Sequence, residues 1–376
     1  MNLLIRGARV LRPDCSGFEQ KDVYVCGERY SSAAPSDRTE LDAGGAFLIP
    51  GLIDIHTHGF RGVSFADPRA DYSYARGSFA RLGITAVVPT VRTMPLPDMA
   101  AALSALSDVP ERERGGAAFP GFHAEGPFIS GSKSGAMSAG NAACTAENFD
   151  LLYGAAGGRL LVMTAAPELE NAASVISHGA SKGVRMSMGH TAALFGEAAA
   201  GADAGASGCT HLFNAMRGFD HREPGALGKM LTDDRLTCEL IADFVHSSPE
   251  AVKLALRMKT PDRLILVSDC GEPAGLGDGV YSVAGNVRTV KDGICRDPAG
   301  KLAGSTRTVD FDARNMLSLG VPLHDVCAMT SRNPAKALGI SGSYGSVEPE
   351  KYADFILCDE KLNVRAVYIG GEPIED

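Results

Sequence analysis

The middle of the chain alternates short apolar runs with helix-like stretches, and this alternation restricts the possible folds more than any other feature. Apolar runs recur at positions 53–55, 85–88, 118–123, 160–164, 184–188, 208–211, 238–242 and 264–268. Stretches rich in Ala, Leu, Glu and Arg separate most of them, as at 74–82, 99–106, 172–178 and 249–258. Alternating strands and helices indicate a parallel sheet, and about eight such units fit an α/β fold of the (β/α)8 TIM-like barrel type. A doubly wound sheet is the alternative, and polar residues at nearly every strand end favour the barrel.

The two ends of the chain differ in composition from the middle. Residues 1–50 and 341–376 contain short apolar stretches separated by Gly, Pro, Ser and Asp, which is typical of short strands with tight turns. We therefore expect a small β-sandwich domain built from both termini, with residues 51–340 forming the barrel. The segment at about 270–305 is rich in glycine and contains a hairpin-like piece. We expect it to be an insertion on the catalytic face of the barrel.

The charge balance and the cysteines limit the possible function classes. With 36 Lys and Arg against 45 Asp and Glu, the formal net charge of −9 argues against a nucleic-acid-binding surface. No apolar run approaches the ~20 residues that a membrane-spanning helix needs, and the amino-terminal residues lack the pattern of a signal peptide. The nine cysteines are scattered and form no CxxC pair, which indicates reduced thiols in a cytoplasmic protein.

Histidines and acidic residues gather where the expected strands end. The first strand-like run is followed by His56 and His58, whose side chains share one face if the strand continues through them. The ends of later strands carry His123, Glu125, His190, His211 and Asp269. The carboxyl ends of barrel strands meet at one face of the barrel, so these imidazoles and carboxylates are expected to converge there. The sequence thus predicts a mixed N/O site for a borderline divalent metal such as zinc or iron(II).

Several motifs in this chain resemble those of the N-acetylglucosamine-6-phosphate deacetylase family of the amidohydrolase superfamily. They are PGLIDIHTHG at 50–59, HAEGPF at 123–128, MGHT at 188–191, THLFNAM at 210–216, HREPG at 221–225, LVSD at 266–269, LAGS at 302–305 and NPA at 333–335. The resemblance runs nearly end to end, and THLFNAM together with HREPG is specific to these deacetylases. It implies hydrolysis of the acetamide of N-acetylglucosamine 6-phosphate to glucosamine 6-phosphate and acetate, in amino-sugar catabolism.

The resemblance also implies roles for the residues at the strand ends. Glu125, His190 and His211 resemble the ligands of the principal metal. His56 and His58 resemble a second metal position, with Glu125 as a possible bridge, so the chain permits one or two metals per subunit. Asp269 is expected to be the general base that takes a proton from water and then returns it to the leaving amine. The fourth strand ends without the lysine that other amidohydrolases carboxylate, and this absence fits the deacetylases.

The same resemblance suggests how the substrate's phosphate is bound. Arg222 and His246 correspond to phosphate ligands that the neighbouring subunit supplies in the family, which implies a homodimer with composite sites. Backbone N–H groups near Asn214 and Ala215 are the other expected phosphate contacts. An intramolecular salt bridge of Arg222 with Glu223 or Asp220 is the alternative to a phosphate contact.

One position departs from the family pattern. Met137 stands where the family has a histidine that contacts the acetyl carbonyl of the substrate, and a thioether cannot donate a hydrogen bond. Either a neighbouring donor or the second metal polarises that carbonyl here, or the acyl group or the sugar differs. Two alternative functions therefore stand beside the main hypothesis. One is hydrolysis of another N-acyl substrate such as N-acetylgalactosamine 6-phosphate, and the other is a non-catalytic scaffold with the amidohydrolase fold.

Overall fold

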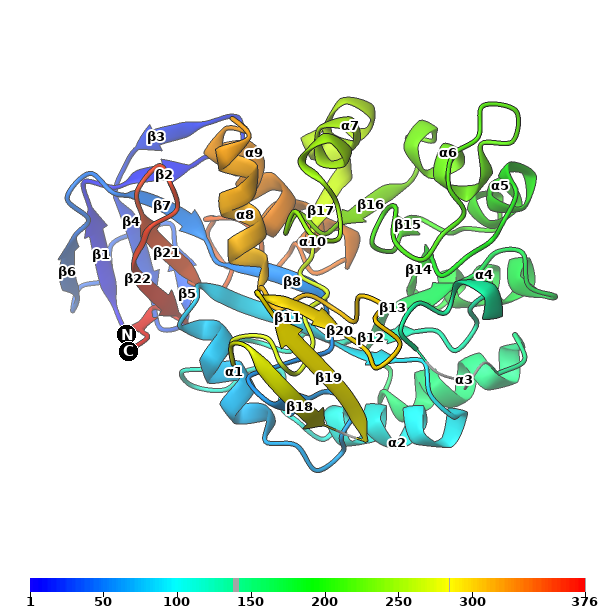
Figure 1. Ribbon diagram of the computed structural model, residues 1–376. Helices are drawn as coiled ribbons and strands as arrows, with labels where there is room; N and C mark the ends of the chain where they lie inside the picture. The colour runs from blue at the N-terminus through cyan, green and yellow to red at the C-terminus, as the bar shows by residue number, and fades with distance from the viewer. Residues whose placement is uncertain (138–141, 284, 376) are drawn as a thin grey trace.

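The computed structural model describes residues 1–137, 142–283 and 285–375, and its centre is a barrel of eight parallel strands (Figure 1). Each strand pairs with the next in chain order, and the barrel closes between the first and the last. A parallel bridge between Thr57 and Cys270 and a 2.9 Å hydrogen bond from Asp269 N to His56 O make this closure. The strands are β8 (Leu52–Thr57), β11 (Ile84–Arg92), β12 (Phe122–Glu125), β13 (Leu160–Ala165), β14 (Arg185–Met188), β15 (Gly208–Cys209), β16 (Thr237–Leu240) and β17 (Leu264–Leu266).

Helices surround the barrel, as the sequence predicts. Several begin at a side-chain cap: the Asp71, Thr145 and Ser248 side chains each accept a hydrogen bond from a backbone N–H of the first turn. The helices are α1 (Tyr72–Ala80), α2 (Leu96–Ser107), α3 (Ala146–Ala155), α4 (Ala172–Ser181), α5 (Phe195–Asp203), α6 (Gly225–Thr232), α7 (Pro249–Lys259), α8 (Val309–Ser318), α9 (Leu323–Cys327) and α10 (Asn333–Ala337). The last two are joined by a π-helical turn at Ala328–Arg332, so the chain continues as a helix through the region before Pro334.

The third barrel strand differs from the expectation. The apolar run predicts a strand at 118–123, whereas β12 begins only at Phe122, and Ala118 makes a single bridge to Ala86. Pro120 lies between them and has no N–H to donate to a ladder. Because β12 begins and ends later than expected, Glu125 is the last residue of the strand and not part of the loop that follows. Its position in the strand restricts the direction of the Glu125 side chain.

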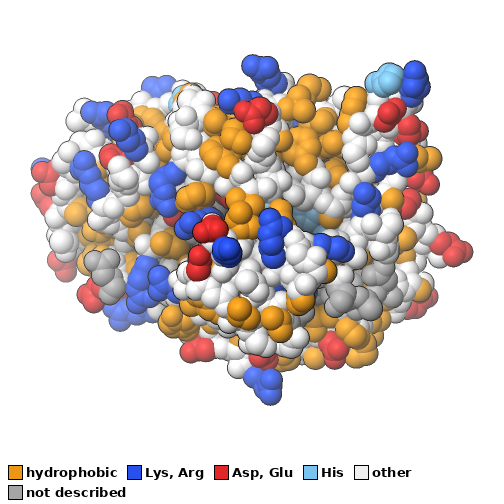
Figure 2. All heavy atoms as spheres, in the orientation of Figure 1, with side chains coloured by type: hydrophobic (Ala, Val, Ile, Leu, Met, Phe, Trp, Pro, Cys, Tyr) orange, Lys and Arg blue, Asp and Glu red, His pale blue; other side chains and the backbone are white. Residues whose placement is uncertain are grey.

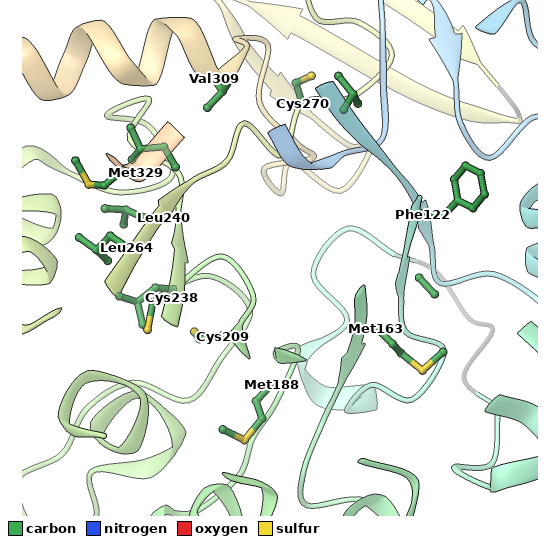
Figure 3. Close-up of a cluster of buried hydrophobic side chains, with 14 of the residues drawn as sticks. Phe122, Met163, Met188, Cys209, Cys238, Leu240, Leu264, Cys270, Val309 and Met329 are labelled. Carbon is green, nitrogen blue, oxygen red and sulfur yellow. The ribbon is translucent and has the colours of Figure 1, made fainter. Parts of the chain in front are cut away.

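Apolar side chains fill both sides of the barrel wall. The larger cluster lies between strands and helices, and Figure 3 shows its members Phe122, Met163 and Met188 on the outer side of the ring of strands. A second cluster lies inside the barrel. It joins residues of β8, β11, β13 and β17, and Ile241 just after β16, to the segment around α10. The barrel is therefore a packed core, and its carboxyl-terminal face is the part left for polar groups.

Both ends of the chain build a small β-sandwich, and the two termini lie close together (Figure 1). One sheet has the order β5-β4-β1-β6 and the other β23-β22-β21-β7-β2-β3. A separate cluster that includes Leu3, Val25, Leu48 and Phe355 forms its core. The strands are β1 (Leu3–Arg6), β2 (Arg9–Leu11), β3 (Phe18–Gln20), β4 (Val23–Cys26), β5 (Arg29–Ser31), β6 (Thr39–Asp42), β7 (Phe47–Pro50), β21 (Phe355–Cys358), β22 (Val364–Ile369) and β23 (Glu372–Pro373).

The glycine-rich segment forms a three-stranded antiparallel sheet of β18 (Gly279–Val283), β19 (Asn286–Lys291) and β20 (Ile294–Arg296). A short two-stranded sheet, β9 (Gly59–Phe60) with β10 (Val63–Ser64), follows the first barrel strand. Arg288 of β19 lines the same cavity as His58 and Glu125, so the insertion reaches the face of the barrel that carries the polar residues. Within the described residues, no helix has the length and apolarity that crossing a membrane requires.

Candidate metal centre

The first barrel strand delivers two histidines to the inside of the barrel. Ile53 and Ile55 belong to the inner apolar cluster, yet His56 and His58 also point inward, because the pairing of β8 with β11 shifts register between Val87 and Pro89. Such an irregularity re-aims side chains and is common beside active sites. His56 is fully buried and His58 nearly so. The prediction that the two rings share one face is confirmed by their common contacts with Glu125 and Asp269.

Glu125 stands at the centre of the site. Its Oε1 atom lies 3.3 Å from His56 Nε2, 3.0 Å from His190 Nε2 and 3.1 Å from His211 Nε2. Its Oε2 atom lies 3.3 Å from His58 Nε2. The five side chains form two overlapping groups with the spacing of a metal site, and Glu125 belongs to both. Glu125 could therefore be shared by two metal positions.

The second nitrogen of three rings determines which atom faces Glu125. His56 Nδ1 lies 3.0 Å from Glu239 Oε2, His58 Nδ1 lies 3.2 Å from the Thr90 carbonyl oxygen, and His190 Nδ1 lies 2.7 Å from the Lys133 carbonyl oxygen. Carboxylate and carbonyl oxygens only accept, so each neutral ring carries its proton on Nδ1. The three Nε2 lone pairs then point at carboxylate oxygens.

Lone pairs that converge on carboxylates require a cation between them. Within the described residues, the buried His56 Nε2 and His211 Nδ1 atoms have no hydrogen-bond partner of acceptable geometry. The His190 and His211 Nε2 atoms lie only 3.0 Å apart. A set of neutral imidazoles with an ionised carboxylate is the donor set that zinc and iron(II) prefer. The residues therefore fit a divalent metal.

Three of the site residues have left-handed backbones. The φ angles of His190, His211 and Asp269 are 47°, 30° and 48°, although none is glycine. Such conformations cost of order 1–3 kcal/mol each and persist only where the surroundings hold them. Each residue lies two or three positions after the end of a barrel strand, and the turn there directs its side chain toward the group of metal-ligand candidates.

Asp269 lies at the edge of the metal centre, as predicted. Its Oδ1 atom is 3.2 Å from His58 Nε2 and 3.6 Å from His56 Nε2. Burial raises the pKa of the Asp269 carboxyl, but the positive charge that His56 and His58 carry when they are protonated lowers it more, and the net pKa lies well below its usual value. Asp269 is therefore ionised and can accept a proton from a group held between it and the metal ligands.

A cavity opens over these groups. His58, Glu125, His190, His211 and Asp269 form its floor, and the residues around them are Arg92, Met137, Asn214, Ala215, His246, Glu272, Arg288 and Leu302, with several glycines and alanines. Figure 2 shows a histidine at the bottom of a hollow whose rim carries several Lys and Arg side chains. A cationic rim around a metal centre can bind an anionic substrate.

Of the expected phosphate ligands, three line this cavity and one does not. Asn214 and Ala215 are at its wall, but the Asn214 N–H already donates to the His211 carbonyl oxygen. His246 lines the cavity of its own chain, with Nδ1 2.8 Å from Asp243 Oδ2, which differs from the expectation that a neighbouring subunit supplies it. The Arg222 side chain is exposed outside the cavity. Within the described residues, the Arg222 side chain forms no salt bridge with Glu223 or Asp220, the alternative role considered for it.

Sequence reasoning missed several residues that hold the site in place. Glu239 of β16 accepts from His56 Nδ1 and from the His211 N–H. Glu168 accepts from the Thr191 hydroxyl and so fixes the turn after His190. Glu239 is an acidic residue within an apolar strand, and Glu168 follows shortly after another apolar strand. An acidic residue in or next to an apolar run is the sequence signal that could have identified them. Conversely, His123 is a structural residue, with its ring nitrogens 3.3 Å from Thr90 Oγ1 and 2.9 Å from Thr164 Oγ1.

Known proteins resemble this chain over nearly its whole length. A model of the amidohydrolase family matches residues 47–374. An N-acetylgalactosamine-6-phosphate deacetylase of Escherichia coli O157:H7 is 36% identical over 341 residues, which cover 90% of each chain. The N-acetylglucosamine-6-phosphate deacetylase of Bos taurus is 34% identical over 389 residues, which cover 99% of this chain and 90% of that protein. A mutant N-acetyl-D-glucosamine-6-phosphate deacetylase of Mycobacterium smegmatis, solved in complex with N-acetyl-D-glucosamine-6-phosphate, superposes with a TM-score of 0.88 at 29% identity and covers 100% of both chains.

Proposed function

Because the chain belongs to the N-acetylglucosamine-6-phosphate deacetylase family of amidohydrolases, we propose that it hydrolyses the acetamide of N-acetylglucosamine 6-phosphate. The products are glucosamine 6-phosphate and acetate. The observation that carries the proposal is the convergence of four histidine Nε2 atoms on Glu125, with Asp269 beside them at the floor of an open cavity. A non-catalytic scaffold has no chemical use for this combination of ligands and base.

The metal is a divalent ion of the zinc or iron(II) type. Glu125, His190 and His211 would hold the principal ion, and His56 and His58 with Glu125 a second one. An ion of this kind lowers the pKa of water to about 7 and polarises a carbonyl oxygen. The Nδ1 contacts of His56, His58 and His190 fix the orientation of the three rings, with the Nε2 lone pairs facing the space that an ion would occupy. The rings would therefore need little rearrangement when an ion binds.

Asp269 acts as the general base and then as the general acid. Its ionised carboxylate accepts the proton of the attacking water at Oδ1, the atom that faces His58 Nε2. It then gives this proton to the amide nitrogen, so that the amine leaves as a neutral group. The left-handed backbone of Asp269 and the hydrogen bond from its N–H to the His56 carbonyl hold the carboxylate in place for both transfers.

The sugar phosphate is bound at the cavity wall formed by Asn214, Ala215 and His246. Burial lowers the pKa of His246, but the ion pair with Asp243 raises it above its usual value, and the protonated ring favours an anionic ligand. Arg222 completes the phosphate site from the partner subunit of a homodimer. Exposed apolar side chains close to Arg222 support such an interface, since Phe219 is 60% exposed and Phe195 is 37% exposed.

The nine unpaired cysteines, eight of them buried, support a reducing compartment such as the cytoplasm.

The E. coli relative is a deacetylase of the galacto sugar, so the test must include both epimers. Purified protein, with its metal content measured, is offered N-acetylglucosamine 6-phosphate, its galacto epimer and the unphosphorylated gluco sugar. We expect the phosphorylated gluco sugar to have the highest kcat/KM. Activity on the galacto epimer alone would reassign the substrate, and absence of both metal and activity would revive the scaffold hypothesis.

A further inference from the structure

Arg92 is the last residue of β11 and stands beside the principal metal ligand. In the pairing of β11 with β12, Thr90 is opposite His123 and Arg92 is opposite Glu125. The Thr90 hydroxyl reaches the His123 ring inside the barrel. Side chains two residues apart on a strand share a face, so Arg92 points to the same inner side as Thr90 and its partner Glu125. The Arg92 side chain lines the cavity together with Glu125.

A buried carboxylate holds Arg92 in place. Arg92 Nη1 donates to Glu272 Oε1 at 2.8 Å, and the Ser64 hydroxyl donates to the same oxygen at 2.8 Å. The side chains of Arg92 and Glu272 are only 13% and 6% exposed. Across residues 1–137, 142–283 and 285–375, Nη1 is the one atom of this guanidinium with a hydrogen-bond acceptor. The Nε and Nη2 donors therefore remain available to a ligand in the cavity.

The neighbouring wall lacks a donor where one is expected. The Met137 side chain lines the cavity, and its sulfur accepts a 3.3 Å contact from the backbone N–H of Thr93, the residue after Arg92. Three other cavity residues outside the metal ligands can donate through a side-chain N–H: Asn214, His246 and Arg288. Asn214 and His246 line the wall assigned to the phosphate, and Arg288 projects from the insertion. Arg92 alone is in β-register with a metal ligand.

We propose that Arg92 is a catalytic residue that donates hydrogen bonds from Nε and Nη2 to the carbonyl oxygen of the substrate's acyl group. Glu272 and Ser64 are positioning residues that orient the guanidinium. The negative charge that develops on this oxygen during attack strengthens the hydrogen bonds, so their effect falls on kcat more than on KM. The inference rests on the proposed amide hydrolysis, and it answers which group replaces the donor that Met137 cannot supply.

The first test compares the Arg92→Met variant with an Arg288→Met control in the same cavity. Loss of an oxyanion donor lowers kcat by about 10²–10³-fold, and we expect this for Arg92→Met with KM and metal content little changed. Arg92→Met leaves the Glu272 carboxylate buried without its partner, so the double variant Arg92→Met/Glu272→Met is measured beside it. The double variant should lose kcat to the same extent. A kcat within about twofold of wild type in either folded variant would overturn the proposal.

Two further readouts separate a catalytic role from a structural one. Added methylguanidinium should restore part of the kcat of the Arg92→Met variant, and introducing Met137→His into that variant should do the same. The affinity for a methylphosphonamidate of glucosamine 6-phosphate, which mimics the tetrahedral state, should fall in parallel with kcat/KM. The affinity for glucosamine 6-phosphate, which lacks the acyl group, should not change. Equal loss of affinity for both compounds would contradict the proposed contact.

The outcomes also distinguish this inference from the proposed function. A wild-type protein that hydrolyses none of the N-acyl sugars with metal bound would reject the function and, with it, the role of Arg92. A wild-type protein that is active while Arg92→Met retains its kcat would reject only the role of Arg92.

Discussion

The Nε2 atom of His190 and the Oε1 atom of Glu125 lie 3.0 Å apart, and a neutral His190 ring has no proton to place between them. Its proton is on Nδ1, which donates to the Lys133 carbonyl oxygen at 2.7 Å. A lone pair that faces a carboxylate at this distance is repulsive unless a proton or a metal ion lies between the two atoms. The site is thus arranged to be stable with a cation bound.

Removal of the metal should destabilise the protein. An ion that binds only the folded state adds about 4 kcal/mol when its concentration is a thousand times its Kd. We expect dialysis against a chelator to lower Tm by several degrees and a stoichiometric addition of zinc to restore it. The His190→Asn variant serves as a control, and its Tm should respond much less to chelation. A chelator-insensitive Tm for a protein that contains metal would contradict the account.

Asp269→Asn should nearly abolish turnover while the metal stays bound. Loss of a general acid–base group lowers rates by about 10²–10⁴-fold, and an asparagine side chain keeps the size of the original but cannot take up the proton. Metal content and kcat are measured on the same sample. Turnover close to wild type would contradict the role of Asp269, and loss of metal would mean that the carboxylate is itself a required ligand.

Glu239→Met should weaken the second metal position more than the principal one, because Glu239 contacts the ring of His56 but only the backbone N–H of His211. Glu239 Oε2 accepts from His56 Nδ1 at 3.0 Å, and contacts of this type contribute about 10–100-fold to metal affinity. Glu239→Gln, which keeps an oxygen acceptor, is the matched control and should lose less. Titration of apo-protein with zinc against a competing fluorescent chelator measures both affinities. Equal weakening of both positions would argue against a specific hold on His56.

Complementation tests whether Arg222 acts across a subunit interface. Arg222→Met and Asp269→Asn chains should each be poorly active alone. In a mixed dimer both defects fall on one site and leave the other intact if Arg222 belongs to the partner's site. Random pairing of the two chains should then leave about a quarter of all sites intact. Unfolding and refolding an equal mixture, followed by an activity assay, gives the answer. No recovery above the mean of the two variants would place Arg222 in its own chain's site or outside any site.

Asp312→Asn should stabilise the protein at neutral pH. Burial raises the pKa of this α8 carboxyl well above its usual value of 3.8, and the nearby Asp243, Asp54 and Asp310 raise it further. Above pH 3.8 the unfolded state releases this proton while the folded state keeps it, so the wild type loses stability as pH rises. Each pKa unit of difference is worth about 1.4 kcal/mol.

Unfolding free energies at pH 4 and pH 7.5 test this expectation. The gain from Asp312→Asn should be at least about 1 kcal/mol at pH 7.5 and near zero at pH 4, because one pKa unit corresponds to 1.4 kcal/mol. Asp22→Asn, at an exposed position, is the control and should change stability little at either pH. A gain that is equal at both pH values would point to packing instead of titration.

The sequence by itself determined the fold class and the chemical types at the site. Strand and helix periodicities are local properties, so the alternation from position 53 to 268 predicted a parallel α/β fold, and the polar residues at the strand ends favoured the barrel. The carboxyl ends of parallel strands must lie at one face, so the polar residues there were expected to converge. The resemblance of the motifs to a deacetylase family implied that Glu125, His190 and His211 are metal ligands. Pro120 is the local signal that was overlooked, and it moved the start of the third strand to Phe122.

Only the tertiary structure decided how those residues are held. The contact of His56 with Glu239 spans 183 positions and that of Arg92 with Glu272 spans 180. Such pairs depend on the register and closure of the barrel, and no local pattern encodes them. The same holds for His246, which the closed barrel brings into its own chain's cavity. Periodicity depends on residues that are close together in the sequence. The site, in contrast, is formed by strand ends that are far apart in the sequence and meet only after the sheet has closed.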